Sequence, residues 1–413
     1  MALIVMKFGG TSVGSTERIC HVATLVLREV ARGNRVIVNV SAMSGVTDSL
    51  ITYVKEVSTP QTPEAFADMD FVVSTGEQVT AGLLALRLQE IGQPARAFAG
   101  WQIPVITSDA FTKARVENIE TQAINAILDQ GHVAVVAGFQ GMTPQQRVTT
   151  LGRGGSDTSA VALAAAFAAD RCDIYTDVDG VYTADPRIVR TARKLDRVSY
   201  EEMLELASQG SKVLQTRSVE LAMNYGVQLQ VLSTFEDKPG TLLVREEEIV
   251  EKHRVTGIAY SRDDARITIA EVEDRPGVAA AIFGPLAEAN INVDMIVQNV
   301  TPDGKATDMT FTVARGDLAR AIKVLKENLV DVGYGALHTD ENVAKVSVIG
   351  VGMRSHAGVA QEMFATLAEK GINLIVISTS EIKISVLIQE AYLELALRSL
   401  HTTYGLDAVV EHG

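Results

Sequence analysis

Short apolar runs alternate with amphipathic segments over the first 245 residues of the chain. Ala2–Met6, Arg35–Val40 and Val133–Gly138 have the length and apolar character of strands buried on both faces. Thr16–Ala31, between the first two runs, carries apolar residues at helical spacing and ends at Gly33. Strand, glycine turn, helix and strand make a βαβ unit, so we expect an α/β domain: a parallel-rich sheet between two layers of helices.

The same pattern predicts the remaining elements of this region. A helix is expected to start near Gly76-Glu77 and to run through Leu88. Further helices are expected at Gly45–Val57, Glu117–Leu128, Tyr200–Ala207 and Thr216–Tyr225, and further strands at Cys172–Thr176, Gln228–Leu232 and Thr241–Val244. Lys7, Ser41 and Ser44 all follow strands, so they should share the carboxyl edge of the sheet, where ligands of such sheets bind.

The last 150 or so residues contain an internal repeat. A shift of 81 residues lays Gly277-Val278 on Gly358-Val359 and Ile291-Asn292 on Ile372-Asn373. Each copy has the order βαββα with a final strand, which is the ferredoxin-like order. Pro285 should bend the first copy's helix or end it early. The lone strand Val255–Tyr260 is expected to complete one sheet from the other end of the repeat.

The charged stretch Arg245–Arg254 is the best candidate for a linker between these two regions. We therefore expect a first domain over residues 1–245, a linker with the lone strand over 246–263, and the two repeat copies over 264–340 and 341–413.

Composition places the chain among ordinary globular proteins, with 47% hydrophobic and 21% charged residues. The net charge of −14 argues against non-specific nucleic-acid binding, although local arginines and amides can still bind an anionic substrate. Two cysteines form no disulfide framework and suit a reducing cytoplasm. The N-terminus lacks a signal-peptide pattern, and no apolar run is long enough to span a membrane.

The most informative stretch is Thr149–Ala162, TTLGRGGSDTSAVA. Three glycines surround Arg153, and cap residues beginning at Ser156 lead into an apolar helical run. Free amides, the helix dipole and an arginine fork favour an anion site at this helix N-terminus. The alternative is a glycine-rich turn that only caps a core helix. A second glycine turn, Lys7–Ser12, makes that alternative less attractive.

Other candidate groups each have a plain alternative. Lys7, before Gly9-Gly10, can neutralise nucleotide phosphates, although the Walker spacing is absent and it could be a surface lysine. Asp177, Asp179 and Asp185 share a loop with Tyr182 that suggests either a calcium loop or a turn packing adenine and ribose. Lys212 is a second possible phosphate contact, and solvated loop charges are the alternative for all of these.

No histidine is well placed as a general base. His21 and His132 are the two histidines of the first domain, and we expect both to be structural. The chain also lacks a nucleophile elbow and a Cys/His metal cluster. A phosphoryl acceptor that needs deprotonation is therefore less attractive than a carboxylate, which is already ionised at pH 7. Catalysis would then consist of alignment and charge neutralisation.

Four motifs together resemble the aspartate kinases, which have the amino-acid-kinase fold. They are KFGGTSV at 7–13, STGE at 74–77, GRGGSD at 152–157 and TDVDGVYTADPR at 176–187. The repeat resembles the paired ACT domains of that family, so the resemblance covers nearly the whole chain. It implies a three-layer sandwich and transfer of the ATP γ-phosphoryl group to L-aspartate, with Mg²⁺ carried mostly by the phosphates. That reaction opens the lysine, threonine, methionine and diaminopimelate routes.

The resemblance also implies residue roles. Lys7 would stabilise the transferred phosphoryl group and Asp157 would order the charges around it. Arg153 would clamp the aspartate α-carboxylate, Glu77 and Asp157 would face the ammonium group, and Thr47 and Ser156 would add hydroxyl contacts. The nucleotide would be held by Lys7, Gly9, Gly10, Ser41, Thr176, Asp177, Tyr182, Arg187, Lys212 and Val213. Few protein ligands for the metal are expected, and none is named.

The ACT pair implies feedback control by lysine and threonine, singly or together. The effector contacts would be Asp274, Gly277, Val278, Ala279, Asn292, Asp294 and Gln298 in the first copy, and Asn373, Ser380 and Glu381 in the second. The alternative is that these residues are helix caps and edge-strand positions. ACT sheets that pair across chains would make a dimer or tetramer, and some relatives make a separate regulatory subunit from an internal start.

Two other interpretations stay open. One is another kinase of the same fold, acting on glutamate, acetylglutamate, carbamate or a nucleotide monophosphate; KFGGTSV and the ACT pair argue against it. The other is an amino-acid sensor with an inactive kinase domain; intact Lys7, Arg153 and Asp157 argue against that.

Overall fold

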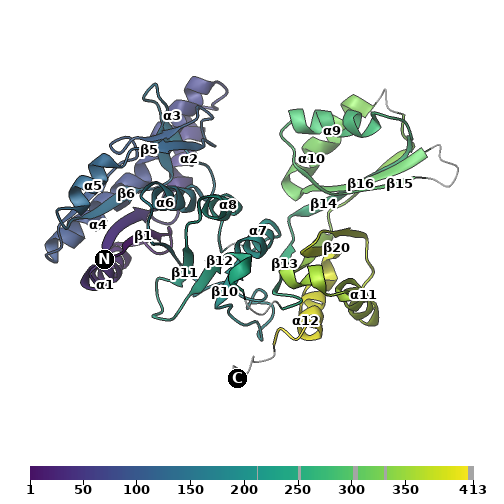
Figure 1. The fold of residues 1–413 in the computed structure, drawn as a ribbon. Helices are drawn as coiled ribbons and strands as arrows, with labels where there is room; N and C mark the ends of the chain where they lie inside the picture. Colours follow the sequence, from purple (N-terminus) through teal and green to yellow (C-terminus); the bar gives the residue numbers. More distant parts are fainter. Residues whose placement is uncertain (212, 250–252, 301–305, 330–332, 408–413) are drawn as a thin grey trace. The chain divides into compact units, whose positions relative to one another are not determined.

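The computed structural model describes the chain except residues 212, 250–252, 301–305, 330–332 and 408–413 (Figure 1). The described residues form two compact units. Unit 1 comprises Met1–Val181, Lys194–Ala207 and Lys212–Val250, and unit 2 comprises Tyr182–Arg193, Ser208–Ser211 and Glu251–Gly413. None of the helices in the described part of the chain is long and apolar enough to cross a membrane.

Unit 1 is built on an eight-stranded sheet. In spatial order its strands are β10 (Arg197–Ser199), β12 (Thr241–Val244), β11 (Leu229–Ser233), β9 (Arg171–Thr176), β1 (Leu3–Phe8), β2 (Arg35–Val40), β6 (Val133–Ala137) and β3 (Ala95–Phe98). Neighbouring strands are parallel except for the antiparallel pair β11 and β12. The predicted parallel-rich sheet is therefore confirmed.

Successive side chains of β1 point to opposite faces of this sheet, as in any strand. On one face Ile4, Met6 and Phe8 pack in a core shared with α1 (Thr16–Ala31) and α4 (Thr75–Glu90). On the other face lies α6 (Gly155–Ala166), and there Lys7 and Asn39 replace apolar residues. Because the register pairs Lys7 with Asn39, these two polar residues lie next to each other under α6.

A small second sheet belongs to the same unit. Its order is β5 (Val116–Ile119), β4 (Val105–Thr107), β7 (Gln140–Met142) and β8 (Val148–Thr150). The helix expected over Glu117–Leu128 was wrong in its first half, since Ile119 pairs with Val105 as a strand and the helix α5 covers only Gln122–Leu128. The other helices of unit 1 are α2 (Val46–Val57), α3 (Pro63–Val73), α7 (Tyr200–Ser208) and α8 (Thr216–Tyr225).

Helix α3 was not expected, although its start carries ordinary signals. The side chain of Thr62 accepts a hydrogen bond from the Ala65 amide, and Pro63 occupies the first helical position, where its missing N–H costs nothing. In the structure Asp70 lies in α3, which makes it a helical residue facing the interior.

Unit 2 contains two four-stranded sheets with two helices each. The first has the order β15 (Val293–Val300), β16 (Ala306–Ala314), β14 (Asp264–Glu273) and β17 (Ala336–Asp340), with α9 (Val278–Glu288) and α10 (Leu318–Asn328). The second has the order β13 (Gly257–Ser261), β18 (Val343–Ile349), β20 (Lys383–Gln389) and β19 (Val376–Thr379), with α11 (Val359–Glu369) and α12 (Leu393–Thr403). Short 3-10 turns of this unit lie at Arg315–Asp317, Val351–Ser355 and Glu390–Tyr392, and another lies at Glu246–Glu248 in unit 1.

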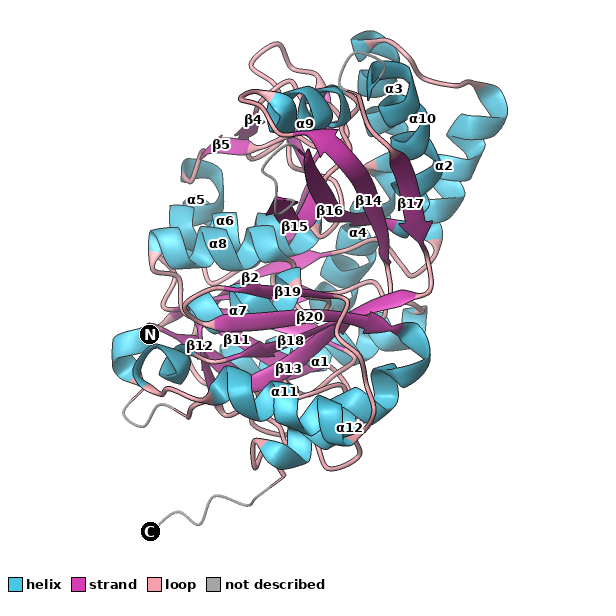
Figure 2. Ribbon diagram, turned by 90° about the vertical axis from the view of Figure 1, so that its right-hand side faces the viewer, coloured by secondary structure: helices cyan, strands magenta, loops and turns pink. Residues whose placement is uncertain are grey.

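Figure 2 shows the strands of the second sheet side by side, with α11 and α12 along them. Strand β13 precedes the whole first copy in the chain and pairs antiparallel with β18 of the second copy. The expectation that the lone strand completes one of the sheets is confirmed. The first repeat copy is thus inserted in sequence between the first two strands of the second sheet.

Pro285 was predicted to bend the helix or to end it early, and the early end was wrong. Helix α9 continues through Pro285 to Glu288 and has 11 residues, the same as its counterpart α11. Pro285 lies in the last turn, so its missing N–H removes at most one hydrogen bond near the helix end. The buried residues Val278, Ile282 and Leu286 hold the helix against its sheet.

Unit 2 also includes a segment from the middle of the first region. Ala184, Ile188 and Val189 belong to the same apolar core as strands β13, β18 and β20. The Ile258 amide donates to the Thr183 carbonyl oxygen over 2.7 Å, and Thr183 Oγ1 lies 2.9 Å from His401 Nε2. The chain therefore leaves unit 1 after Val181 and returns to it at Lys194. The expected first domain, residues 1–245, did not include this excursion of the chain into unit 2.

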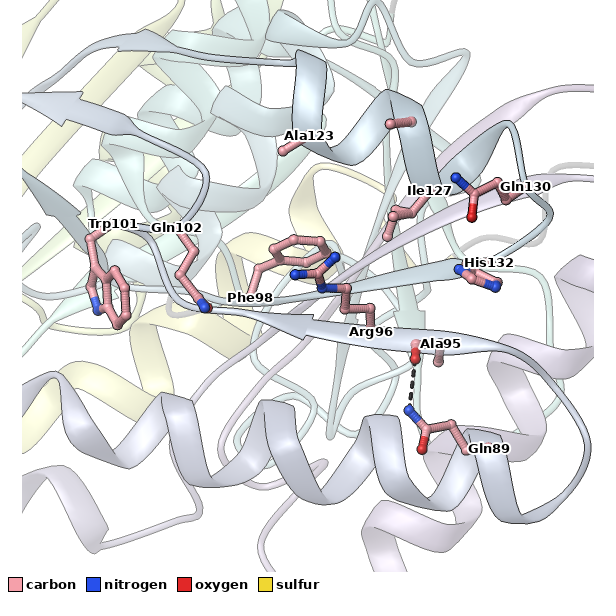
Figure 3. A pocket seen from close by; sticks show the side chains of 11 residues that line it. Gln89, Ala95, Arg96, Phe98, Trp101, Gln102, Ala123, Ile127, Gln130 and His132 are labelled. Atoms are coloured by element: carbon pink, nitrogen blue, oxygen red, sulfur yellow. Dashed lines mark hydrogen bonds between the residues drawn. The ribbon is translucent and has the colours of Figure 1, made fainter.

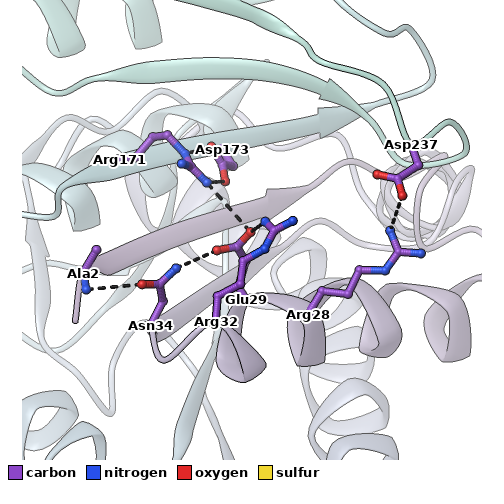
Figure 4. A network of polar contacts seen from close by, with 8 residues as sticks. All are labelled: Ala2, Arg28, Glu29, Arg32, Asn34, Arg171, Asp173 and Asp237. Atoms are coloured by element: carbon purple, nitrogen blue, oxygen red, sulfur yellow. Dashed lines mark hydrogen bonds and ion pairs between the residues drawn. The ribbon is translucent and has the colours of Figure 1, made fainter.

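A buried charged network joins the sheet of unit 1 to the end of α1 (Figure 4). The Arg171 guanidinium donates to both carboxylate oxygens of Asp173, over 2.6 and 2.8 Å. Glu29 accepts from Arg32 and from Asn34 in the same network. Asp173 is fully buried, and this burial raises the pKa of its carboxyl group despite the partly opposing hydrogen bonds from Arg171.

We expect Arg171→Met to lower the free energy of unfolding by about 3 kcal/mol, because it leaves the Asp173 carboxylate buried without its partner. Urea unfolding followed by circular dichroism measures this. Arg28, also drawn in Figure 4, forms an ion pair with Asp237 in which the two side chains are 51% and 86% exposed. Arg28→Met breaks this pair and should lower the free energy of unfolding by less than about 1 kcal/mol. Equal losses in the two variants would contradict the prediction.

Candidate active site

A buried ion pair lies at the carboxyl end of the first strand. Lys7 Nζ is 2.5 Å from Asp157 Oδ1, and each side chain is about 10% exposed. Asp157 stands in the first turn of α6, where a negative charge is favoured by the helix dipole. The pair holds an ammonium group at the edge of the sheet where ligands bind, and fixes its direction.

Glycine allows the backbone after Lys7 to pass unusually close to its surroundings. A Cβ on Gly9 would lie 3.4 Å from Lys7 Nζ, and one on Gly10 would lie 3.1 Å from the Ala42 carbonyl oxygen. The Gly9 amide donates to the Tyr175 carbonyl oxygen over 3.2 Å, which fixes the turn against β9. An anion could therefore approach both the turn and the ammonium group.

The second glycine loop is positioned by backbone geometry and by one buried amide. Gly154, the N-cap of α6, has a φ of 68°, in the left-handed region that favours glycine. Asn39 Nδ2 donates to the Ser156 carbonyl oxygen over 2.8 Å, so β2 holds the first turn of the helix. Asn39 was missed by the sequence analysis; the signal was a polar residue within the apolar run RVIVNV.

Arg153 lies between these anchored glycines and is exposed. Within the part of the chain that the structure describes, no hydrogen bond or ion pair engages its guanidinium group. A planar cation presented by a rigid loop, and not consumed by an internal contact, can bind a carboxylate through two parallel hydrogen bonds.

Glu77 brings a buried carboxyl group to the same edge. Its Oε1 accepts the Ala42 amide over 3.0 Å, and its Oε2 is buried without a hydrogen-bond partner among the described residues. Burial raises the pKa of Glu77 to about 7, against the opposing effect of the Ala42 hydrogen bond. An orphaned carboxylate oxygen retains the capacity to accept a donor from a ligand, such as an ammonium group.

Several predicted residues of the site lie at neighbouring strand ends. The Ser41 amide donates to the Phe8 carbonyl oxygen over 3.0 Å, so the ends of β1 and β2 are joined. Thr176 ends β9, the other neighbour of β1, and its hydroxyl donates to Asp177. Thr47 is half-buried in α2, and Val213 is half-buried in the segment before α8. Lys212 lies outside the described residues.

Two predicted nucleotide contacts lie in unit 2. Tyr182 is half-buried there, and Arg187 is exposed. The Arg187 guanidinium donates to both oxygens of Asp185, which also accepts the Tyr260 hydroxyl over 3.0 Å. The hydrogen bond from Arg187 lowers the pKa of Asp185, and this outweighs burial.

The acidic residues of the same loop do not converge as calcium ligands would. Asp179 pairs with Lys194 at 3.2 Å, and Asp185 pairs with Arg187 at 2.8 Å. The described residues contain no group of three histidine, cysteine, aspartate or glutamate side chains that could hold a metal ion. The calcium-loop alternative therefore has no support in the geometry.

The predicted effector residues occupy two matching regions of unit 2. Gly277 and Gly358 are both left-handed N-caps, with φ of 93° and 100°. Asp294 on β15 accepts a hydrogen bond from Lys345 Nζ over 2.7 Å, and Glu381 pairs with Arg354. Among the other predicted contacts, Val278 is buried. The exposed ones are Asp274, Ala279, Asn292, Gln298, Asn373 and Ser380.

The edge strands of the two copies meet within unit 2. Met295 on β15 shares an apolar cluster with Val343 on β18, Val376 on β19 and Leu387 on β20. Burial favours a higher pKa for the Asp294 carboxyl group, but the hydrogen bond and charge of Lys345 reverse this and hold it below its ordinary value. Asp294 is therefore tied to the second copy.

A cavity of about 850 Å³ lies away from these groups, beside the edge strand β3 (Figure 3). Its lining includes Arg96, Phe98, Trp101 and His132, and none of the predicted site residues. Arg96 lies over the Phe98 ring, 5.1 Å from its centroid. The buried ion pair, the orphaned carboxylate oxygen and the glycine loops therefore place the candidate site at the strand ends and not in this cavity.

His21, as expected, has a structural contact, with Nε2 2.8 Å from the Thr234 carbonyl oxygen.

Comparison with known proteins identifies relatives along the whole chain. Residues 2–233 match the amino acid kinase family, and residues 266–330 and 346–404 match ACT domains. An aspartate kinase of Pseudomonas fluorescens is 54% identical over the full length of both chains. The crystal structure of E. coli aspartokinase III in complex with aspartate and ADP (R-state) has a TM-score of 0.81 at 26% identity, covering 97% of this chain and 99% of that one. The same enzyme in complex with lysine and aspartate (T-state) has a TM-score of 0.77 at 25% identity, with the same coverage.

We expect Glu77→Gln to stabilise the protein at pH 8 by on the order of 2 kcal/mol. In the folded protein burial raises the pKa of this carboxyl group from its ordinary value of 4.5 to about 7, so its ionisation opposes folding increasingly between these two pH values and fully above pH 7. Glutamine can still accept the Ala42 amide without that cost. Urea unfolding at pH 8 and pH 5 measures the difference, which should shrink at pH 5; an advantage independent of pH would contradict the assignment.

Proposed function

Because the chain belongs to the aspartate kinase family, we propose that it transfers the γ-phosphoryl group of ATP to the β-carboxylate of L-aspartate, giving 4-phospho-L-aspartate and ADP. Its relatives over the full length show that it is an ATP-dependent kinase with ACT domains consistent with allosteric control. The proposed product leads into lysine, threonine and methionine synthesis.

The observation that carries the proposal is the buried Lys7–Asp157 pair at the N-terminus of α6, with the orphaned oxygen of Glu77 at the same sheet edge. Lys7 neutralises charge on the phosphoryl group during transfer, helped by the Gly9 and Gly10 backbone. Asp157 keeps the Lys7 ammonium directed into the site. These groups align reactants and offset charge, and none of them has to remove a proton from the acceptor.

The acceptor is held by complementary charges in this proposal. Arg153 binds the α-carboxylate of aspartate and Glu77 binds its ammonium group, with hydroxyl contacts from Thr47 and Ser156. The β-carboxylate is ionised at neutral pH, so it attacks without a general base. The E. coli relative crystallised with aspartate and ADP supports this pair of ligands.

The proposed nucleotide contacts come from the strand ends and from the loop that follows β9. Lys7, Gly9, Gly10 and Ser41 lie on the phosphate side, and Thr176, Asp177, Tyr182, Arg187, Lys212 and Val213 complete the proposed contacts. Mg²⁺ would enter with ATP and neutralise charge on its phosphates. The described residues offer no cluster of metal ligands of their own, so the phosphates would supply most of its coordination.

Regulation is proposed to act through the ACT pair. Lysine or threonine, or both, would bind at the residues predicted from the repeat, with Asp274, Asn292, Asp294 and Gln298 in the first copy. The lysine complex of the E. coli relative supports lysine as one effector. Sheet pairing across chains would give a dimer or tetramer. Two free thiols, Cys20 and Cys172, suit a cytoplasmic location.

The first experiment is ATP turnover with L-aspartate, with the acyl phosphate trapped by hydroxylamine. The protein should form aspartate-dependent hydroxamate, and lysine and threonine, alone and together, should reduce it. Lys7→Ala should lower kcat at least about a hundredfold while leaving effector binding intact, because Lys7 lies in unit 1 and the effector residues lie in unit 2. An unchanged kcat would remove Lys7 from the mechanism, and turnover with glutamate or carbamate instead of aspartate would replace the substrate.

Arg153→Lys should raise the KM for aspartate about tenfold and leave the KM for ATP nearly unchanged, because an ammonium group cannot form the two parallel hydrogen bonds that a guanidinium group donates to a carboxylate. Arg147→Lys is the matched control, since Arg147 is half-exposed and pairs only with the exposed Asp68 among the described contacts. Steady-state kinetics in both substrates distinguishes the variants. A rise confined to the KM for ATP would assign Arg153 to the nucleotide.

A further inference from the structure

Asp70 is a buried carboxylate that belongs to none of the sequence motifs. It lies on α3, is 1% exposed, and accepts three hydrogen bonds. Its Oδ2 accepts the backbone amides of Thr112 and Thr150, both over 2.8 Å, and its Oδ1 accepts the Thr150 hydroxyl over 2.7 Å. None of the ion pairs of the described residues includes Asp70, so its partners among these residues are three neutral donors.

The three donors come from two chain segments that meet only through tertiary structure. Thr150 is the last residue of β8 and stands three positions before Arg153. Thr112 lies in the loop before β5 and has a φ of 67°, a conformation that a threonine rarely adopts without support. The Ala114 amide donates to the Thr150 carbonyl oxygen over 3.0 Å, which joins the two segments directly.

Arg217 on α8 holds the same two segments from their carbonyl side. Its Nη1 donates to the Leu151 carbonyl oxygen over 3.0 Å, and its Nη2 donates to the Ala114 carbonyl oxygen over 2.8 Å. Asp70 thus accepts hydrogen bonds from backbone N–H groups of the two segments, and Arg217 donates hydrogen bonds to their backbone carbonyl groups. A Cβ on Gly152 would be 3.0 Å from the Thr112 carbonyl oxygen, so the glycine loop passes tightly over the joined segments.

From this geometry we propose that Asp70 is a positioning residue for the phosphoryl acceptor: it anchors the entry of the glycine loop so that Arg153 meets the substrate carboxylate at a fixed place. Asp70 does not touch the substrate and acts through Thr150 and Gly152. The inference rests on the proposed function for the role of Arg153, but the anchoring itself is a property of the loop. Misplacement of a binding group by about 1 Å can cost up to a hundredfold in rate.

The kinetic test compares two substitutions at one site. Asp70→Ala removes the acceptor for all three donors, and the KM for aspartate should rise at least about tenfold, with the KM for ATP changed less than about twofold. Asp70→Asn keeps one oxygen for the two amides, while its own amide can donate to the Thr150 hydroxyl, so it should restore the KM to within about threefold of the parent. Thr150→Val removes only the hydroxyl and should raise the KM about threefold.

Asp68→Ala is the matched control on the same helix, because it breaks only an exposed pair with Arg147. Hydrogen exchange of peptides covering residues 148–155 gives a readout that does not need turnover. Faster exchange in Asp70→Ala than in Asp68→Ala, restored in Asp70→Asn, is expected. If Asp70→Ala does not fold, the comparison of Thr150→Val with Asp68→Ala decides.

Each alternative outcome has a defined meaning. An unchanged KM for aspartate in Asp70→Ala, or equal rises in both KM values, overturns the positioning role even if the melting temperature falls. Unchanged exchange in the 148–155 peptides overturns the anchoring. If the parent protein forms no aspartate-dependent hydroxamate, the proposed function fails, and the exchange experiment still decides whether Asp70 anchors the loop.

Discussion

The contact between Lys7 and Asp157 is the interaction on which the arrangement of unit 1 depends. It joins the first strand of the chain to a helix that begins about 150 residues later, and it places a positive charge beneath that helix's N-terminus. A buried ion pair is a weak source of stability, because desolvation of both charges offsets their attraction. Its value lies in specificity: β1 and α6 can meet in only one register without leaving a charge unpaired.

Other buried polar groups of this edge are incompletely satisfied within the protein. Glu77 Oε2 and Asn39 Oδ1 have no hydrogen-bond partner among the described residues. Natural proteins usually pair such groups, and departures from that rule concentrate at functional sites. The raised pKa of Glu77 has the same origin, because burial without a full set of hydrogen-bond donors disfavours the ionised carboxylate. A carboxyl group that is to bind a ligand must keep an oxygen without a partner in the protein.

The excursion Tyr182–Arg193 sets a second constraint. Its backbone hydrogen-bonds to β13, its apolar side chains fill the core of the second ACT copy, and Thr183 contacts the buried His401, which also contacts Asp407. Tyr182 and Arg187, both expected to hold nucleotide, are therefore held by the fold of unit 2. Any rearrangement of that sheet that moves Thr183 also moves the adjacent backbone of Tyr182, because the two residues are covalently joined.

Local pattern in the sequence determined the parallel-rich sheet, the internal repeat, the lone strand that completes one of the repeat's sheets, and the candidate residues Lys7 and Arg153, because periodicity, glycine turns and polar residues after strands are local signals. Glu77 became a candidate only through the resemblance of STGE at 74–77 to a family motif. It did not determine that residues 116–119 pair as a strand, or that α9 runs through Pro285, since pairing partners and packing decide those outcomes. Asn39 and Asp70 find their hydrogen-bond partners only when distant segments meet. Asn39 belongs to no motif, and Asp70 looks like any other aspartate of its helix until Thr112 and Thr150 donate to it. The tertiary structure alone decides such residues, because a hydrogen bond between positions 42 or 80 apart leaves no trace in the spacing of either.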